Sequence, residues 1–191
     1  MKITIVSGSA RENNNTIRVA YALEKLTQAN HEVQVIDFSN YDIPFLSQGG
    51  FKPTELTAFQ ASCVAAFENS NLILFVSPEY NWSTTPELLN LLHCLSFPPF
   101  KNALQNKVFS FVGVSSGKGG KVPAIQLMQI VNKLIGFSQT ESIVSAKIFE
   151  VHFVKEVLDE KGNSLGNQLF DIGLAEYCNY TLAIAKRWLQ A

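Results

Sequence analysis

The chain has 191 residues, enough for one domain with a sizeable core, and carries a net charge of −1 from 15 basic and 16 acidic residues. No block of lysine and arginine stands out, which argues against nucleic acid as a partner. No apolar run reaches the roughly 18–20 residues that a membrane span needs, so no membrane association is expected.

The three cysteines are an odd number without Cys-x-x-Cys spacing. Cys63, Cys94 and Cys178 each lie in an apolar run and are interpreted as small buried hydrophobic residues. This usage fits a reducing cytoplasm and favours neither a disulfide framework nor a metal site. The chain opens directly into a strand-like run without the regions of a signal peptide, so we expect a cytoplasmic location.

Charged residues make up 16% of the chain, against about 25% in a typical soluble protein. Together with 14 phenylalanines, this low fraction favours an apolar surface between subunits. We therefore expect a homodimer or homotetramer with the contact at residues 86–95 and 97–100. The alternative is that the apolar helix at 86–95 belongs to the core of one subunit.

In chain order, the hydrophobic pattern predicts strands at 3–6, 31–37, 71–77, 108–114 and 143–151, and helices at 16–26, 54–67, 86–95, 123–135 and 165–189. Continuous apolar runs at 72–76 and 108–114 are typical of central parallel strands. The alternation predicts a single α/β domain over residues 1–191, with helices on both faces of a parallel sheet. Five strands favour the doubly wound order 2-1-3-4-5, which binds ligands at the loops after strands 1, 3 and 4.

The loop after the first strand, residues 7–16, is rich in hydroxyl and amide side chains and leads into a helix. Free N–H groups at a helix N-terminus favour an anion. The expected phosphate ligands are the Ser9 and Thr16 hydroxyls, the Arg11 guanidinium, and the Asn14 and Asn15 amides. The alternative is an asparagine-rich turn in which Asn15 caps the helix. The loop matches neither a dinucleotide fingerprint nor a P-loop.

The loop after the third strand, residues 77–86, offers flat apolar side chains in Tyr80 and Trp82. Asn81 tolerates unusual backbone angles. A planar heterocycle could lie on this loop, and residues 84–87 match a capping box for the next helix. The alternative is an ordinary turn in which Trp82 packs on a neighbour.

The loop after the fourth strand has four glycines between Gly113 and Gly120, which allow close approach of the backbone to a ligand. Residues 113–117 also match Gly-x-Ser-x-Gly, the elbow of serine hydrolases, with Ser115 as nucleophile. That alternative requires His152, the one downstream histidine, and glycines follow the serine where a hydrolase has a helix.

Three of these segments resemble the NADPH-dependent FMN reductase family of flavodoxin-like proteins. They are Gly-Ser-Ala-Arg at 8–11, Pro-Glu-Tyr-Asn at 78–81, and Ser-Ser-Gly with Gly-Gly at 115–120. Residues 158–162 are also similar to the family's segment before the last helix, so the likeness runs in order along nearly the whole chain. Relatives in this family act on quinones, azo dyes and chromate.

The resemblance implies a flavodoxin-like fold, bound FMN, and NADPH or NADH as electron donor. The residues it places at the cofactor are Ser9, Arg11, Thr16 and Asn14 at the phosphate, Pro78, Glu79, Tyr80 and Asn81 at the isoalloxazine, and Ser115, Ser116 and Gly117 at the far edge of the flavin. Hydride would pass to flavin N5, and two electrons would then go to a flavin, a quinone or a similar small acceptor. No catalytic side chain is implied, because the flavin performs the chemistry.

Three residues on the helix at 86–95 depart from the family pattern. Glu87 follows Pro86 where glycine is usual, Leu89 stands where lysine is common, and His93 stands near the usual aspartate. These changes bear on how two subunits contact each other and on the choice of electron acceptor more than on FMN binding. A second alternative is a non-enzymatic electron carrier or flavin sensor, although carriers of this fold tend to be strongly acidic and this chain is nearly neutral.

Overall fold

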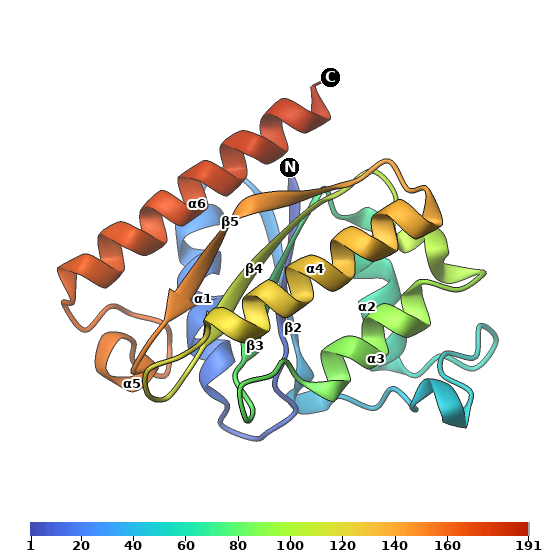
Figure 1. Ribbon diagram of the computed structural model, residues 1–191, viewed down its shortest axis with the longest axis horizontal. Helices are drawn as coiled ribbons and strands as arrows, with labels where there is room; N and C mark the ends of the chain where they lie inside the picture. The colour runs from blue at the N-terminus through green and yellow to red at the C-terminus, as the bar shows by residue number, and fades with distance from the viewer. Residues whose placement is uncertain (191) are drawn as a thin grey trace.

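Five parallel strands form one sheet in the order β2-β1-β3-β4-β5 in the computed structural model, which describes residues 1–190 (Figure 1). The strands are β1 (Lys2–Ser7), β2 (Glu32–Asp37), β3 (Leu72–Pro78), β4 (Val108–Val114) and β5 (Ile143–Val151). This confirms the predicted doubly wound fold. The predicted domain, residues 1–191, extends one residue beyond the described part of the chain.

The helices are α1 (Asn15–Thr27), α2 (Ala58–Asn69), α3 (Pro86–Leu95), α4 (Lys121–Ser138), α5 (Val154–Val157) and α6 (Gln168–Leu189). Short 3₁₀ turns lie at Phe38–Asn40, Leu46–Gln48 and Phe100–Leu104. Buried residues of α1 and α6 pack on one face of the sheet, and those of α2, α3 and α4 pack on the other (Figure 1). Within residues 1–190, no helix combines the length and apolar character needed to cross a membrane.

The two central strands are buried along their whole length, as their apolar runs predict. On one face, the rings of Phe75 and Phe111 stack with centroids 5.7 Å apart. On the other face, the fully buried Tyr177 of α6 shares a hydrogen bond of 2.6 Å with the Ser110 hydroxyl. The sheet is therefore held rigidly between its helices, and its strand ends are fixed points for the loops.

Two helices begin later than the sequence pattern predicts, because polar side chains cap them. The predicted helix at 54–67 begins at Ala58, where Thr57 accepts the Gln60 backbone N–H and the Gln60 side chain accepts the Thr57 N–H. The predicted helix at 165–189 begins at Gln168, since Asn167 accepts the Phe170 N–H at 3.1 Å.

The leucines of α3 belong to the core of the protein. Leu88, Leu91, Leu92 and Leu95 are fully buried against the sheet. This burial supports the alternative, that the apolar face of the helix belongs to the core of one subunit, and a subunit contact at residues 86–95 and 97–100 stays a prediction. Phe97, in the segment that follows α3, remains 54% exposed.

The three cysteines are free and buried, as predicted. Burial raises the pKa of the Cys63 and Cys178 thiols to about 12 each. Burial also raises the pKa of Cys94 above its ordinary value. All three thiols are protonated near neutral pH and pack as apolar groups.

Candidate functional site

The loops after β1, β3 and β4 meet at one cavity of about 180 Å³, at the carboxyl ends of the strands. It is lined by Ser9, Arg11, Glu12, Asn13, Asn14, Asn15, Pro78, Glu79, Tyr80, Val114, Ser116 and Lys155. This is the position at which a doubly wound sheet binds its ligand. Eight of the twelve residues predicted from the sequence line the cavity: Ser9, Arg11, Asn14, Asn15, Pro78, Glu79, Tyr80 and Ser116.

The first loop is organised around the side chain of Asn14, which caps α1. Its Oδ1 accepts the Ile17 backbone N–H at 2.8 Å and the Thr16 hydroxyl at 2.6 Å. Asn14, and not Asn15, is therefore the N-cap. The capped helix leaves the backbone N–H groups of its first residues, Asn15 and Thr16, without intrahelical acceptors. Asn15 adds a buried side-chain Oδ1 that has no hydrogen-bond partner among the described residues.

Thr16 does not line the cavity. Its side chain is fully buried, and its hydroxyl contacts Asn14 at 2.6 Å and the Ser7 hydroxyl at 2.9 Å. This arrangement gives the Thr16 hydroxyl a positioning role, because it fixes Asn14 and through it the start of α1. The predicted contact between this hydroxyl and a phosphate has no support in the geometry.

Arg11 and Tyr80 bring the first and second loops into contact. The Arg11 guanidinium carbon lies 4.1 Å from the centre of the Tyr80 ring, within range of a cation–π interaction. The Tyr80 hydroxyl shares a hydrogen bond of 2.6 Å with the buried Ser9 hydroxyl. Two of the predicted phosphate ligands, Ser9 and Arg11, therefore form one connected cluster with Tyr80, which was predicted at the ring.

A tight turn follows Tyr80. Tyr80 and Ser83 exchange backbone hydrogen bonds of 2.9 and 3.0 Å, and the two residues between them have positive φ. Asn81 has φ of 46°, as its tolerance for such angles allows, and Trp82 has φ of 61°. The Trp82 side chain is 76% exposed, so the alternative in which it packs on a neighbour is wrong. Asn81 does not line the cavity.

The helix after this turn is capped one residue later than predicted. Thr85 accepts the Leu88 backbone N–H at 3.3 Å and is the N-cap of α3. Thr84, the predicted cap, instead pairs its hydroxyl with that of Ser77 at 2.9 Å. Both hydroxyls are buried, so they fix the path of the loop between β3 and α3.

Glu79 holds the glycine-rich loop after β4. Its carboxylate accepts the backbone N–H of Gly120, and a Cβ on Gly119 would lie 2.7 Å from the carboxylate oxygens. A Cβ on Gly113 would lie only 1.6 Å from the Gly120 carbonyl oxygen, so Gly113 is required for this packing. Glu79 therefore shapes the wall of the cavity by positioning the neighbouring loop.

Ser115 and Gly117 shape this loop without lining the cavity. Gly117 N–H donates to the Ser115 hydroxyl at 3.2 Å. His152 is engaged elsewhere, because its Nδ1 accepts the Gly119 N–H at 3.1 Å and its Nε2 lies 3.8 Å from a Glu150 oxygen. Within residues 1–190, no hydrogen bond joins Ser115 to His152, so the geometry does not support the serine hydrolase alternative.

Four residues that line the cavity were not predicted from the sequence: Glu12, Asn13, Val114 and Lys155. Glu12 and Asn13 fall inside the predicted first loop, and Val114 ends a predicted strand. Lys155 comes from α5, a four-residue helix too short to show a hydrophobic period. Its position after β5 was the one available signal, because the carboxyl end of that strand also faces the ligand side of the sheet.

The three residues that depart from the family pattern, Glu87, Leu89 and His93, lie on α3 and do not line the cavity. Asn90 is buried and ties the helix to the segment after β2: its amide donates to the Tyr41 hydroxyl at 2.7 Å and the Pro44 carbonyl at 3.0 Å. His93 is exposed, and Leu89 is partly buried. The Oε2 of Glu87 is buried and has no hydrogen-bond partner among the described residues.

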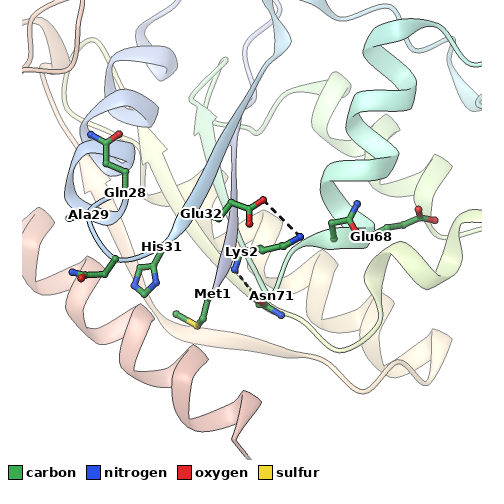
Figure 2. Close-up of a pocket in the computed structure, with 10 residues that line it drawn as sticks. Met1, Lys2, Gln28, Ala29, His31, Glu32, Glu68 and Asn71 are labelled. Atoms are coloured by element: carbon green, nitrogen blue, oxygen red, sulfur yellow. Dashed lines mark hydrogen bonds and ion pairs between the residues drawn. The ribbon is translucent and has the colours of Figure 1, made fainter.

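A larger depression of about 710 Å³ lies at the amino ends of the strands (Figure 2). Lys2 and Glu32 approach there to 3.9 Å, and the Lys2 backbone N–H donates to the Asn71 side chain at 2.9 Å. It is shallow and open to solvent. Because ligands of this sheet type bind at the carboxyl ends, the smaller cavity is the candidate site.

The sequence matches the family model described as NADPH-dependent FMN reductase over residues 1–149. Three plant relatives are 30% identical: "Probable NADPH:quinone oxidoreductase 2" of Oryza sativa subsp. japonica over 136 residues, NAD(P)H:quinone oxidoreductase of Solanum tuberosum over 137, and NADPH:quinone oxidoreductase of Arabidopsis thaliana over 135. The alignments cover 68% of this chain but only 64% to 66% of the length of these relatives.

Two solved structures share the fold. The flavoenzyme NAD(P)H:(acceptor) oxidoreductase FerB from Paracoccus denitrificans has a TM-score of 0.76 at 16% identity, over 97% of both chains. An apo form of the NADH:FMN oxidoreductase EMOB has a TM-score of 0.65 at 17% identity, over 95% of this chain and 89% of that one. Sheet order and loop placement define the chain as a flavodoxin-like protein. The match over residues 1–149 shows that it belongs to the NADPH-dependent FMN reductase family.

Proposed function

We propose that the protein binds FMN and works as an NAD(P)H-dependent oxidoreductase that passes two electrons to a flavin, a quinone or a similar small acceptor. The observation that carries this proposal is the single cavity where the start of α1, Arg11 and the Tyr80 loop meet. Family membership and the names of the plant quinone oxidoreductases support it. We also propose that residues 1–191 form one FMN-binding domain.

The residues of the cavity fit FMN. The N-terminus of α1 offers free backbone N–H groups, and Arg11 offers a charge-assisted contact to a phosphate. The buried Asn15 Oδ1 has no hydrogen-bond partner within residues 1–190 and suits a hydroxyl donor such as those of the ribityl chain. Pro78 and Tyr80 offer backbone and ring surfaces in the same cavity, and Ser116 adds a hydroxyl.

The chain positions its cofactor and contributes no acid or base. When bound, FMN would supply the redox chemistry, which is to accept a hydride from the nicotinamide and to deliver two electrons. Glu79 fixes the glycine loop, and the Ser9–Tyr80 hydrogen bond fixes the second loop against the first. Positioning of this kind is effective because hydride transfer requires reacting atoms about 3–3.5 Å apart.

The proposal predicts that purified protein binds FMN and not FAD, is yellow, and bleaches on addition of NADPH or NADH. We further expect ping-pong kinetics, in which NAD(P)H reduces the flavin and leaves before the acceptor enters the same face. Rates over a grid of NADPH and quinone concentrations decide this, and intersecting double-reciprocal lines would contradict it. His93→Ala serves as a control and keeps full turnover, because no histidine is assigned a proton-transfer role.

Two further features of the proposal concern the setting of the protein. The free, buried cysteines fit a reducing compartment, which supports a cytoplasmic location. The low charged fraction and exposed aromatic residues such as Trp82 and Phe97 support a homodimer or homotetramer. A carrier without enzymatic activity is disfavoured, because nearly neutral charge gives weak steering of protein partners.

A further inference from the structure

Lys155 places a second cation on the wall of the cavity, outside the motifs that define the family. It lies on α5, beyond the matched residues 1–149. It lines the same cavity as Arg11 and the start of α1. In Figure 1, α5 lies beside α1, at the ligand end of the sheet. This part of the cavity wall is therefore formed by the C-terminal segment, beyond the residues that match the family model.

The backbone around Lys155 is held by the glycine-rich loop. Phe153 N–H donates to the Gly117 carbonyl at 3.0 Å, and Val154 N–H donates to the Ser115 carbonyl at 3.3 Å. Val154 and Val157 are buried on either side of Lys155 and anchor α5 in the core. Lys155 is thus presented from a fixed backbone, although its side chain is exposed.

The charge of Lys155 has no acidic partner within 4.0 Å in the described part of the chain. Arg18 on α1 and Lys147 on β5 do have one: Arg18 lies 3.4 Å from Glu160, and Lys147 lies 3.8 Å from Glu176. Of the two carboxylates that line the cavity, Glu79 is engaged by the Gly120 N–H, and Glu12 forms no ion pair within residues 1–190. A free ammonium on this wall therefore suits an anion inside the cavity.

We propose that Lys155 acts with Arg11 as a second cation for the phosphate of bound FMN. This inference rests on the proposed function and extends it to a residue outside the family motifs. A phosphate monoester carries a charge of about −1.5 to −2 at neutral pH, which one guanidinium balances only in part. A lysine serves such a group as a mobile point charge, while arginine contributes fixed, planar contacts.

The test compares FMN with riboflavin, which lacks the phosphate. Affinities are measured by quenching of flavin fluorescence with the apo forms of wild type, Lys155→Ala, Lys155→Arg and a control, Lys186→Ala, at an exposed lysine outside the cavity. We expect Lys155→Ala to raise the Kd for FMN about tenfold. The Kd for riboflavin stays within about twofold, and the arginine and control variants keep near wild-type affinity. Added salt should reduce the difference in the Kd for FMN between wild type and Lys155→Ala.

Three outcomes would overturn the proposal. Equal losses for FMN and riboflavin would place Lys155 at the ring or ribityl chain. An unchanged Kd for FMN, with wild type binding FMN tightly, would remove Lys155 from the site and leave the proposed function intact. A raised KM for NADPH but not for NADH, with FMN binding unchanged, would assign Lys155 to the donor's extra phosphate. Failure of wild type to bind FMN would instead contradict the proposed function itself.

Discussion

Arg11 illustrates how one side chain is held ready for a ligand. Its guanidinium lies over the Tyr80 ring, with the carbon 4.1 Å from the ring centre. Stacking on a ring face leaves the N–H groups of the guanidinium edge free to donate to an anion. The Ser9 hydroxyl holds the same ring through the Tyr80 oxygen. The geometry therefore restricts Arg11 to a small region before any phosphate arrives.

We expect Arg11→Ala to weaken FMN binding by roughly 1.5–3 kcal/mol, the contribution of a charge-assisted hydrogen bond. Thr16→Ala should add to the loss by releasing Asn14 and loosening the start of α1, since the Thr16 hydroxyl contacts Asn14 at 2.6 Å. Titration of the apo-protein with FMN measures both effects, with Arg187→Ala on α6 as a control. Unchanged affinity in the double variant would contradict the placement of the phosphate.

The sequence identifies the residue types of the site better than the role of each. Ser9, Arg11 and Tyr80, which the sequence singles out, line the cavity. Thr16 and Thr84 were misassigned, because both hydroxyls are bonded to side chains of β1 or β3 that lie seven or more residues away in sequence. Such pairs form only when a loop folds back on its own strand, and a linear motif carries no signal of this.

At the scale of elements, strong periodicity and capping chemistry decide what is predictable. The bounds of β4, β5 and α3 agree with the prediction, because long apolar runs and a leading proline mark them. The four residues of α5 carry no such period, so the helix and Lys155 on it were missed. Its position depends on backbone hydrogen bonds to Ser115 and Gly117, which exist only in the folded chain.

The turn at Asn81 and Trp82 stores backbone strain next to the candidate site. A left-handed conformation costs an L-residue with a bulky side chain roughly 1–2 kcal/mol, and Trp82 has φ of 61°. Its side chain is 76% exposed, so packing offsets little of this cost. Strain of this kind is typical of functional loops.

Trp82→Gly should therefore raise the free energy of unfolding by about 1 kcal/mol, because glycine adopts positive φ without the steric penalty. Urea denaturation of the apo-protein measures the change. Asn81→Gly is the matched control and should give a smaller gain, since asparagine already tolerates this region. A clear loss of stability in Trp82→Gly would show that the indole packs in a way that its exposure does not indicate.

At the scale of the molecule, the alternation of strands and helices was sufficient to predict the sheet order. Right-handed crossovers and one core leave few arrangements for five parallel strands. The hydrophobic pattern left open whether α3 belongs to the core or to a subunit contact. A helix that is apolar on several sides can pack against its own sheet or against a second subunit. Here its leucines join the core, and the helix contacts the 3₁₀ turns at Leu46–Gln48 and Phe100–Leu104.

The assembly of the protein can be tested at the surface that α3 leaves exposed. Light scattering at micromolar concentration should give the mass of a dimer or tetramer. Phe97 follows α3 and is 54% exposed. The Phe97→Asp variant should contain a larger fraction of monomer than wild type, because it would bury an unpaired charge in the subunit contact. Leu169→Asp, at a residue 86% exposed on α6, is the matched control and should leave the mass unchanged. A monomeric wild type would refute the assembly, and dissociation by Leu169→Asp alone would move the contact to α6.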